Sequence, residues 1–68
     1  MTFGDRLQIA LDRKGMLQKE LAERIGVTSI SINRYIHNVR MPDINILKKI
    51  CNVLDISADW FIGRKEDK

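Results

Sequence analysis

Cysteine and histidine occur only once each in this sequence of 68 residues, as Cys51 and His37. A single cysteine excludes an internal disulfide, and one cysteine with one histidine cannot supply the usual ligands of a zinc site. The sequence also contains no nucleophile with a neighbouring base and no phosphate-binding loop. We therefore expect a protein that is not an enzyme and that uses no metal or cofactor.

Glycine and proline are scarce as well, with four and one residues respectively. This scarcity argues against an all-β fold, which needs many turns. Long apolar runs are missing, so no segment is expected to span a membrane, and the first residues show no signal-peptide pattern. These absences predict a cytoplasmic protein that does not bind a membrane.

The length and the charge of the chain set looser limits. Sixty-eight residues suffice for one domain with one modest core, and the hydrophobic content of 44% predicts that this domain folds. The net charge is +3 and the isoelectric point about 9.4. Such a mildly basic balance fits a nucleic-acid partner, but it fits an ordinary protein surface equally well.

Five segments of the chain have apolar residues at the spacings of three and four that an amphipathic helix requires. No segment has the alternation of a strand. The five stripes are Phe3, Leu7, Ala10 and Leu11; Leu21, Ala22 and Ile25; Ile32, Tyr35 and Ile36; Ile46 or Leu47 with Ile50, Cys51 and Leu54; and Trp60, Phe61 and Ile62. The pattern predicts an all-α fold, a compact bundle of five short helices.

Residues that favour helix ends separate these stripes. Serine, threonine and aspartate before a helix can accept hydrogen bonds from its first amides, and glycine or asparagine can end a helix in the left-handed conformation. We expect caps at Thr2, Thr28, Asp43 and Ser57, and stops at Gly15, Gly26, Asn38 and Gly63. One domain should therefore cover residues 1–63, followed by a charged, frayed tail at 64–68.

The most informative segment is residues 18–37, QKELAERIGVTSISINRYIH. Two short helices are joined here by a tight turn at Gly26, where glycine can take a positive φ without steric cost. Ala22, four residues earlier, is small where the two helices must approach each other. This spacing is typical of a DNA-binding helix-turn-helix.

The chain resembles the phage repressor and Cro family of regulators, also called the xenobiotic-response-element class. The resemblance covers almost the whole chain, through FGDRL, GMLQKELAERIGVT and MPDINILKKICNVLDISADWFIG. The combination of QxELAxxxGV, PxxxxLxxI and the final DWxxG in this order is specific. The resemblance implies a lambda-repressor-like bundle of five helices whose third helix enters the major groove of DNA.

The resemblance also implies which residues contact DNA. The N-terminal part of the third helix would read bases, Gln18 would brace the phosphate backbone, and His37 and Arg40 would contact the backbone or flanking bases. The residues carried over for base reading are Thr28, Ser29, Ile30, Asn33 and Arg34.

The helical period supports most of these assignments. Ile30, Asn33, Arg34 and His37 project away from the apolar side of the third helix. An arginine can donate two hydrogen bonds to guanine, an asparagine can pair with adenine, and an isoleucine can contact a thymine methyl group. Other roles stay open at this point, because Arg34 could bind phosphate and His37 and Ile30 could be ordinary surface residues.

The sequence departs from the family pattern at three places. Leu17 stands where relatives carry a serine or threonine cap, so the second helix should begin more loosely or be capped by another group. Leu11 and Ile36 stand where many relatives carry an arginine and a glutamate, and we expect their side chains to touch. Asn38 replaces a glycine and should tolerate the same left-handed conformation.

These observations favour a sequence-specific transcriptional regulator, of the repressor type found in phages and mobile elements. A reader of this size covers few base pairs, which predicts a homodimer on a two-fold operator in double-stranded DNA. The region around Trp60 and Phe61, with the loop 38–42, is the expected dimer surface, although both aromatic residues could instead close the core. The alternative is a protein-interaction module such as an antitoxin, which the five residues after Gly63 disfavour.

Overall fold

The computed structural model describes residues 1–62, which form five α-helices and no strand. All four predicted caps are confirmed, because the side chains of Thr2, Thr28, Asp43 and Ser57 each accept a hydrogen bond from the third amide of their helix. No helix in this part of the chain is long and apolar enough to cross a membrane. The helices are α1 (Phe3–Lys14), α2 (Gln18–Ile25), α3 (Ser29–Ile36), α4 (Ile44–Leu54) and α5 (Ala58–Phe61).

The predicted helix stops are also confirmed where the structure describes them. Gly26 and Asn38 have φ angles of 78° and 61°, in the left-handed region. The sequence did not predict the same conformation at Asp55, which ends α4 with a φ of 56°. Ile62 was expected on the apolar side of the last helix, but it lies just beyond α5 and is 56% exposed. The predicted stop at Gly63 and the predicted tail at 64–68 lie outside the described residues.

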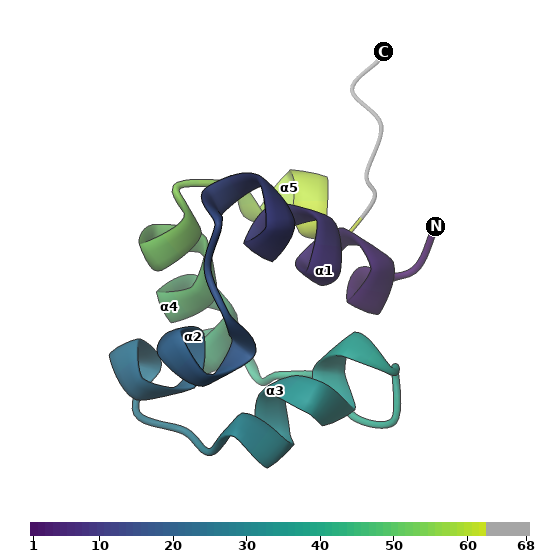
Figure 1. Cartoon of the computed structure of the whole chain (residues 1–68). Helices are drawn as coiled ribbons and strands as arrows, with labels where there is room; N and C mark the ends of the chain where they lie inside the picture. The colour runs from purple at the N-terminus through teal and green to yellow at the C-terminus, as the bar shows by residue number, and fades with distance from the viewer. Residues whose placement is uncertain (63–68) are drawn as a thin grey trace, which may run out of the picture.

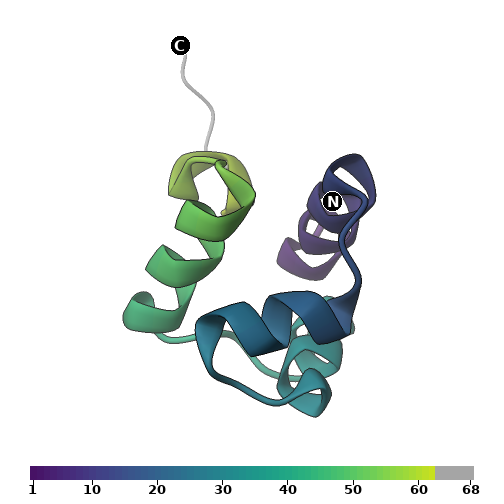
Figure 2. The same cartoon turned by 60° about the vertical axis from the view of Figure 1, so that its left-hand side comes forward.

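The helices form a base and two walls. In Figure 1, α2 and α3 lie at the bottom, α1 and α5 at the top and α4 at the left, and Figure 2 shows α1 and α4 standing on opposite sides above α2. Helix α2 packs against α3 and α4, helix α1 packs against α3 and α4, and α5 contacts both α1 and α4. The arrangement leaves the outer side of α3 uncovered by the rest of the bundle.

The predicted stripes meet in one core between these helices. No polar or charged residue of the described chain is buried. Phe61 has no exposed surface, which confirms the alternative that it closes the core and removes it from the expected dimer surface; its ring packs 5.5 Å from that of Phe3. The buried residues are Phe3, Leu7, Ala10, Leu11, Leu21, Ala22, Ile25, Ile32, Tyr35, Ile50, Leu54 and Phe61.

Candidate nucleic-acid interface

The turn between α2 and α3 fixes the angle at which α3 leaves the bundle. The amides of Gly26 and Val27 both donate to the carbonyl oxygen of Ala22, at 3.0 Å. Thr28 then takes an extended conformation, and its hydroxyl oxygen accepts from the Ser31 amide at 3.2 Å. The Thr28 hydroxyl is therefore occupied in capping α3.

Helix α3 is divided sharply into a buried side and an exposed side. Ile32 and Tyr35 are 0% and 6% exposed and hold the helix on the core. Ile30 is 63% exposed, although burial is the usual place for isoleucine. The other side chains predicted to read bases from this helix, Ser29, Asn33 and Arg34, are exposed as well.

Gln18 is the first residue of α2 and is half-buried. Leu17 before it is 68% exposed and supplies no side-chain acceptor to the helix. The Leu17 amide instead donates to the Glu20 carboxylate at 3.1 Å, so the side chain of Glu20 holds the residue before the helix and caps no amide of the helix itself. The amides of the first turn therefore receive no cap from the side chain of Leu17 and can interact with an anion at this end of α2.

His37 and Arg40 lie at the other end of α3, where the chain turns away from the helix. His37 is the C-terminal cap residue, and its amide donates to the carbonyl oxygen of Asn33 at 3.0 Å. The amides of Val39 and Arg40 turn back to the carbonyl oxygen of Arg34, at 2.9 and 3.4 Å. Both His37 and Arg40 are exposed. The segment that carries His37 and Arg40 is thus attached to the last turn of α3 by backbone hydrogen bonds.

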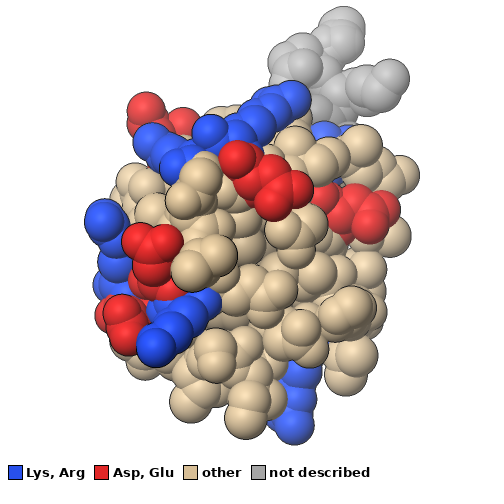
Figure 3. All heavy atoms as spheres, viewed as in Figure 1, with Lys and Arg blue, Asp and Glu red and all other residues tan. Residues whose placement is uncertain are grey.

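The candidate interface carries no carboxylate on its central part. Residues 24–42, which include the turn, α3 and the following loop, contain no aspartate or glutamate, whereas Arg24, Arg34 and Arg40 are basic. In Figure 3, acidic side chains lie on the upper and left-hand parts of the face shown, while the lower right part over α3 shows none. A phosphate backbone laid along α3 therefore meets little charge repulsion.

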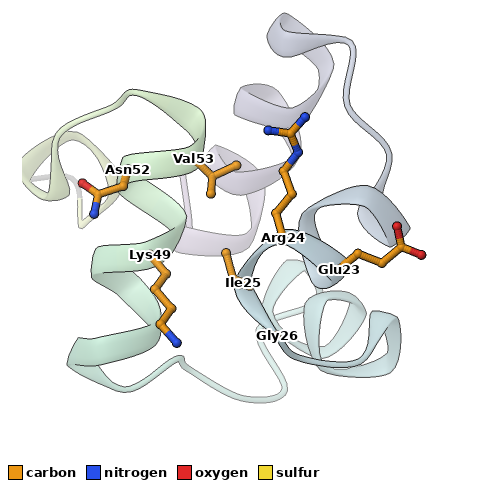
Figure 4. A pocket seen from close by; sticks show the side chains of 7 residues that line it. All are labelled: Glu23, Arg24, Ile25, Gly26, Lys49, Asn52 and Val53. Atoms are coloured by element: carbon orange, nitrogen blue, oxygen red, sulfur yellow. The ribbon is translucent and has the colours of Figure 1, made fainter.

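Two hollows lie on the surface of residues 1–62, and neither gathers groups suited to catalysis. A shallow cleft of about 440 Å³ lies between the end of α2 and α4, and Figure 4 shows that its charged side chains, Glu23, Arg24 and Lys49, point in different directions. A second groove of about 280 Å³ follows the outer side of α4. It is lined mainly by apolar groups, including those of Ile44, Leu47 and Cys51. Burial raises the pKa of the Cys51 thiol, which disfavours the reactive thiolate.

Two of the departures from the family pattern have a structural outcome. Asn38 takes the expected left-handed conformation, but the sequence did not predict that its side chain would hydrogen-bond to the start of α1. Leu11 is fully buried, and Ile36 is half-buried and packs against the same core. Their direct side-chain contact stays a prediction.

Comparison with known proteins supports the same architecture. A family model described as helix-turn-helix matches residues 7–61. The HTH-type transcriptional regulator ImmR of Bacillus subtilis is 33% identical over 97% of this chain and 52% of its own length. The SPbeta prophage-derived regulator YonR of the same organism is 32% identical over 88% of this chain and 56% of its own length. The chain thus spans about half the length of these curated relatives.

Solved structures agree with the described fold. The structure of SinR, a regulator of biofilm formation, in complex with DNA covers 88% of this chain at 31% identity with a TM-score of 0.82, and 97% of that chain is matched. The P22 c2 repressor with a synthetic operator has the same fold, with a TM-score of 0.90 at 18% identity over 96% of this chain and 98% of its own. The predicted lambda-repressor-like fold is confirmed, and the chain belongs to the helix-turn-helix family.

Proposed function

We propose that this chain is a sequence-specific DNA-binding domain of a transcriptional regulator, and that it acts as a repressor of the phage or mobile-element type. The observation that supports this most directly is that the outer side of α3 is exposed and free of carboxylates. The inner side of the same helix is packed on the core through Ile32 and Tyr35. The structures of SinR in complex with DNA and of the P22 c2 repressor with a synthetic operator have the same fold and support the proposal. The role requires no cofactor and no catalytic step, and it places the protein with DNA in the cytoplasm.

The proposed domain covers residues 1–63, and its segment 18–37 contacts a major groove of double-stranded DNA. Within α3 we assign guanine recognition to Arg34, adenine recognition to Asn33 and a thymine methyl contact to Ile30. Ser29 and Thr28 have short side chains that suit nearby bases or phosphates. These assignments rest on the exposure of the side chains and on their common side of the helix.

Contacts from the start of α2 and from the segment after α3 would hold the domain on the DNA backbone. Gln18 lies at the start of α2, where the helix end favours a phosphate group. His37 and Arg40 lie beyond the other end of α3, in a segment whose backbone is bonded to Arg34. The backbone contacts fix the register, and the three readers in α3 supply the sequence preference.

Selection of bound duplexes from a random DNA pool tests this function. We expect a consensus that extends over two half-sites about one helical turn apart. A pool that remains random at low salt would contradict sequence-specific recognition. The protein used is the full chain, and the selected consensus duplex then serves as the probe for variants.

Single substitutions in α3 separate base reading from phosphate binding. We expect Arg34→Ala to reduce the preference for one base pair by about tenfold and to leave the salt dependence of binding unchanged. Ile30→Ala should weaken the preference for thymine at a different position. Ile62→Ala is the matched control, because Ile62 is also exposed but lies outside α3, after α5. Uniform weakening with a shallower salt dependence would reassign Arg34 to phosphate.

We also propose that the domain binds its operator as a homodimer, through an apolar surface on α4 and the preceding loop. Val39, Met41 and Ile44 are 74%, 58% and 65% exposed, and Ile44 continues into the groove with Leu47 and Cys51. Large exposed apolar patches mark interaction sites, and the loop carrying Val39 and Met41 directly follows α3. A two-fold axis near this loop would present two copies of α3 to the same face of the DNA, in half-sites about one helical turn apart.

Sedimentation of the protein with the consensus duplex tests the dimer. Ile44→Asp should lower the stoichiometry from two chains to one per operator, because it introduces a charge into the apolar surface. Ile62→Asp serves as the control at an exposed isoleucine of similar accessibility outside this surface. Two chains bound per operator by the Ile44 variant would contradict the proposed surface.

A further inference from the structure

Asn38 connects the end of α3 to the beginning of α1. Its amide oxygen accepts from the Gly4 backbone amide at 3.0 Å, and its amide nitrogen donates to the Thr2 hydroxyl at 2.9 Å. The partners are 34 and 36 residues away in the sequence. We call this pair of hydrogen bonds the Asn38 clasp.

The clasp satisfies groups that the helix ends cannot satisfy themselves. The Gly4 amide is in the first turn of α1, where amides have no partner within the helix. The Thr2 hydroxyl, which receives the second bond of the clasp, also accepts from the Asp5 amide at 3.1 Å. The side chain of Asn38 therefore completes the N-terminal cap of a different helix.

A close backbone contact lies beside the clasp. A Cβ atom at Gly4 would overlap the carbonyl oxygen of Ile36 and would lie 2.8 Å from the carbonyl oxygen of Tyr35. The first turn of α1 therefore rests directly on the last turn of α3. Asn38, two residues beyond the end of α3, fastens this contact from outside.

The segment fastened by the clasp also carries Arg40. On one side, the amides of Val39 and Arg40 bond to the Arg34 carbonyl oxygen. On the other side, Asn38 bonds to α1. The direction in which Arg40 leaves α3 is thus fixed both by α3 itself and by α1.

We propose that Asn38 is a positioning residue for DNA binding, which holds Arg40 in place for its phosphate contact without touching DNA itself. The inference rests on the proposed function, because it needs Arg40 to contact DNA. A preorganised side chain loses less conformational entropy on binding, so a fixed loop favours affinity. In a chain with glycine at this position, the left-handed turn would remain and the clasp would be absent.

Asn38→Gly is the variant that isolates the clasp, because glycine keeps the positive φ of 61° without strain. On the consensus duplex, with every variant fully folded at the measuring temperature, we expect Asn38→Gly to raise Kd about fivefold. It should leave the slope of log K against log salt nearly unchanged, because Arg40 still reaches its phosphate in the complex. Arg40→Ala should reduce the magnitude of this slope by about 0.9, because it removes one phosphate contact.

A double-mutant cycle provides the decisive measurement. In the Arg40→Ala background, Asn38→Gly should leave Kd unchanged, because there is no arginine left to position. An equal loss in both backgrounds, or no loss in either, would overturn the inference. Ile50→Val is the control for stability alone, because Ile50 is buried in α4 away from the clasp, and it should change neither Kd nor the salt slope.

The same experiments distinguish a failure of the proposed DNA-binding function from a failure of the positioning role of Asn38. A chain that selects no sequence from the random pool overturns the proposed function. A chain that binds its consensus while Arg40→Ala binds equally well retains the proposed function and overturns only the role of Asn38.

Discussion

The guanidinium carbon of Arg6 lies 5.3 Å from the centre of the Trp60 ring, and that of Arg13 lies 5.9 Å from the same point. Trp60 also meets the ring of Phe61 edge-on at 5.3 Å. Both arginines belong to α1 and Trp60 belongs to α5, so the half-buried indole attaches the short last helix to the first one. Cation–π contacts of this kind stabilise a fold modestly, and they require the cation to lie over the face of the ring.

We therefore expect Trp60→Ala to lower the free energy of unfolding by about 2 kcal/mol, less than the loss of a fully buried aromatic side chain. Urea denaturation followed by circular dichroism measures this loss. Trp60→Phe should restore part of it, because a ring remains between the arginines and Phe61. Unchanged stability of the alanine variant would mean that the contacts of Trp60 contribute nothing to the fold.

Gly4→Ala should be more damaging, by about 3 kcal/mol, because its Cβ would meet backbone atoms of Tyr35 and Ile36, which cannot rotate away. Thermal unfolding of the purified variant measures the effect. Gly15→Ala is the matched control, since a Cβ there meets no atom within 4 Å and only the left-handed φ of 65° is strained. It should cost about 1 kcal/mol. Equal losses for the two variants would contradict the close contact at Gly4.

Leu17→Ser should stabilise the free protein by about 1 kcal/mol, because serine can accept a hydrogen bond from the first turn of α2 and leucine cannot. Leu17→Ala separates this capping effect from the removal of an exposed apolar side chain and should leave stability nearly unchanged. Denaturant midpoints of the three proteins provide the comparison. A serine variant no more stable than the alanine variant would show that α2 needs no further cap.

The predicted contact between Leu11 and Ile36 can be tested by restoring charges of opposite sign. Leu11→Arg should cost about 3 kcal/mol, because it places a charge in the core, and Ile36→Glu should also destabilise the protein. If the two side chains touch, the double variant should be more stable than the sum of the single losses predicts, by about 1 kcal/mol or more. Pairing Leu11→Arg with Ile30→Glu is the control, because Ile30 faces solvent. A strictly additive result for positions 11 and 36 would contradict the contact.

The helices, their caps and most of the core could be predicted from the sequence because each depends on neighbours within a few residues. Thr28, for example, caps an amide only three residues away. The Asn38 clasp could not be predicted in this way, because its partners come from the other end of the domain and no periodicity links them.

The roles of Trp60 and Phe61 show a second limit. These two residues are adjacent in a helix of four residues, which is too short for a period to define an inner and an outer side. The structure buries Phe61 and leaves Trp60 half-buried against α1. For the candidate interface, the outward side of α3 follows from its helical period, and the absence of carboxylates from residues 24–42 can be read from the sequence itself.

The exposed Leu17 before α2 links the stability of this helix start to the binding of an anion. On the proposed function, a DNA phosphate would be the anion that completes this helix start, and part of the free energy of folding would be gained only on DNA binding. Linkage then requires the melting temperature to rise with operator concentration. The Leu17→Ser protein, which would carry its own cap, should gain less from the same DNA. Leu17 thus lowers the stability of the free domain and thereby increases the gain in stability that DNA binding would bring.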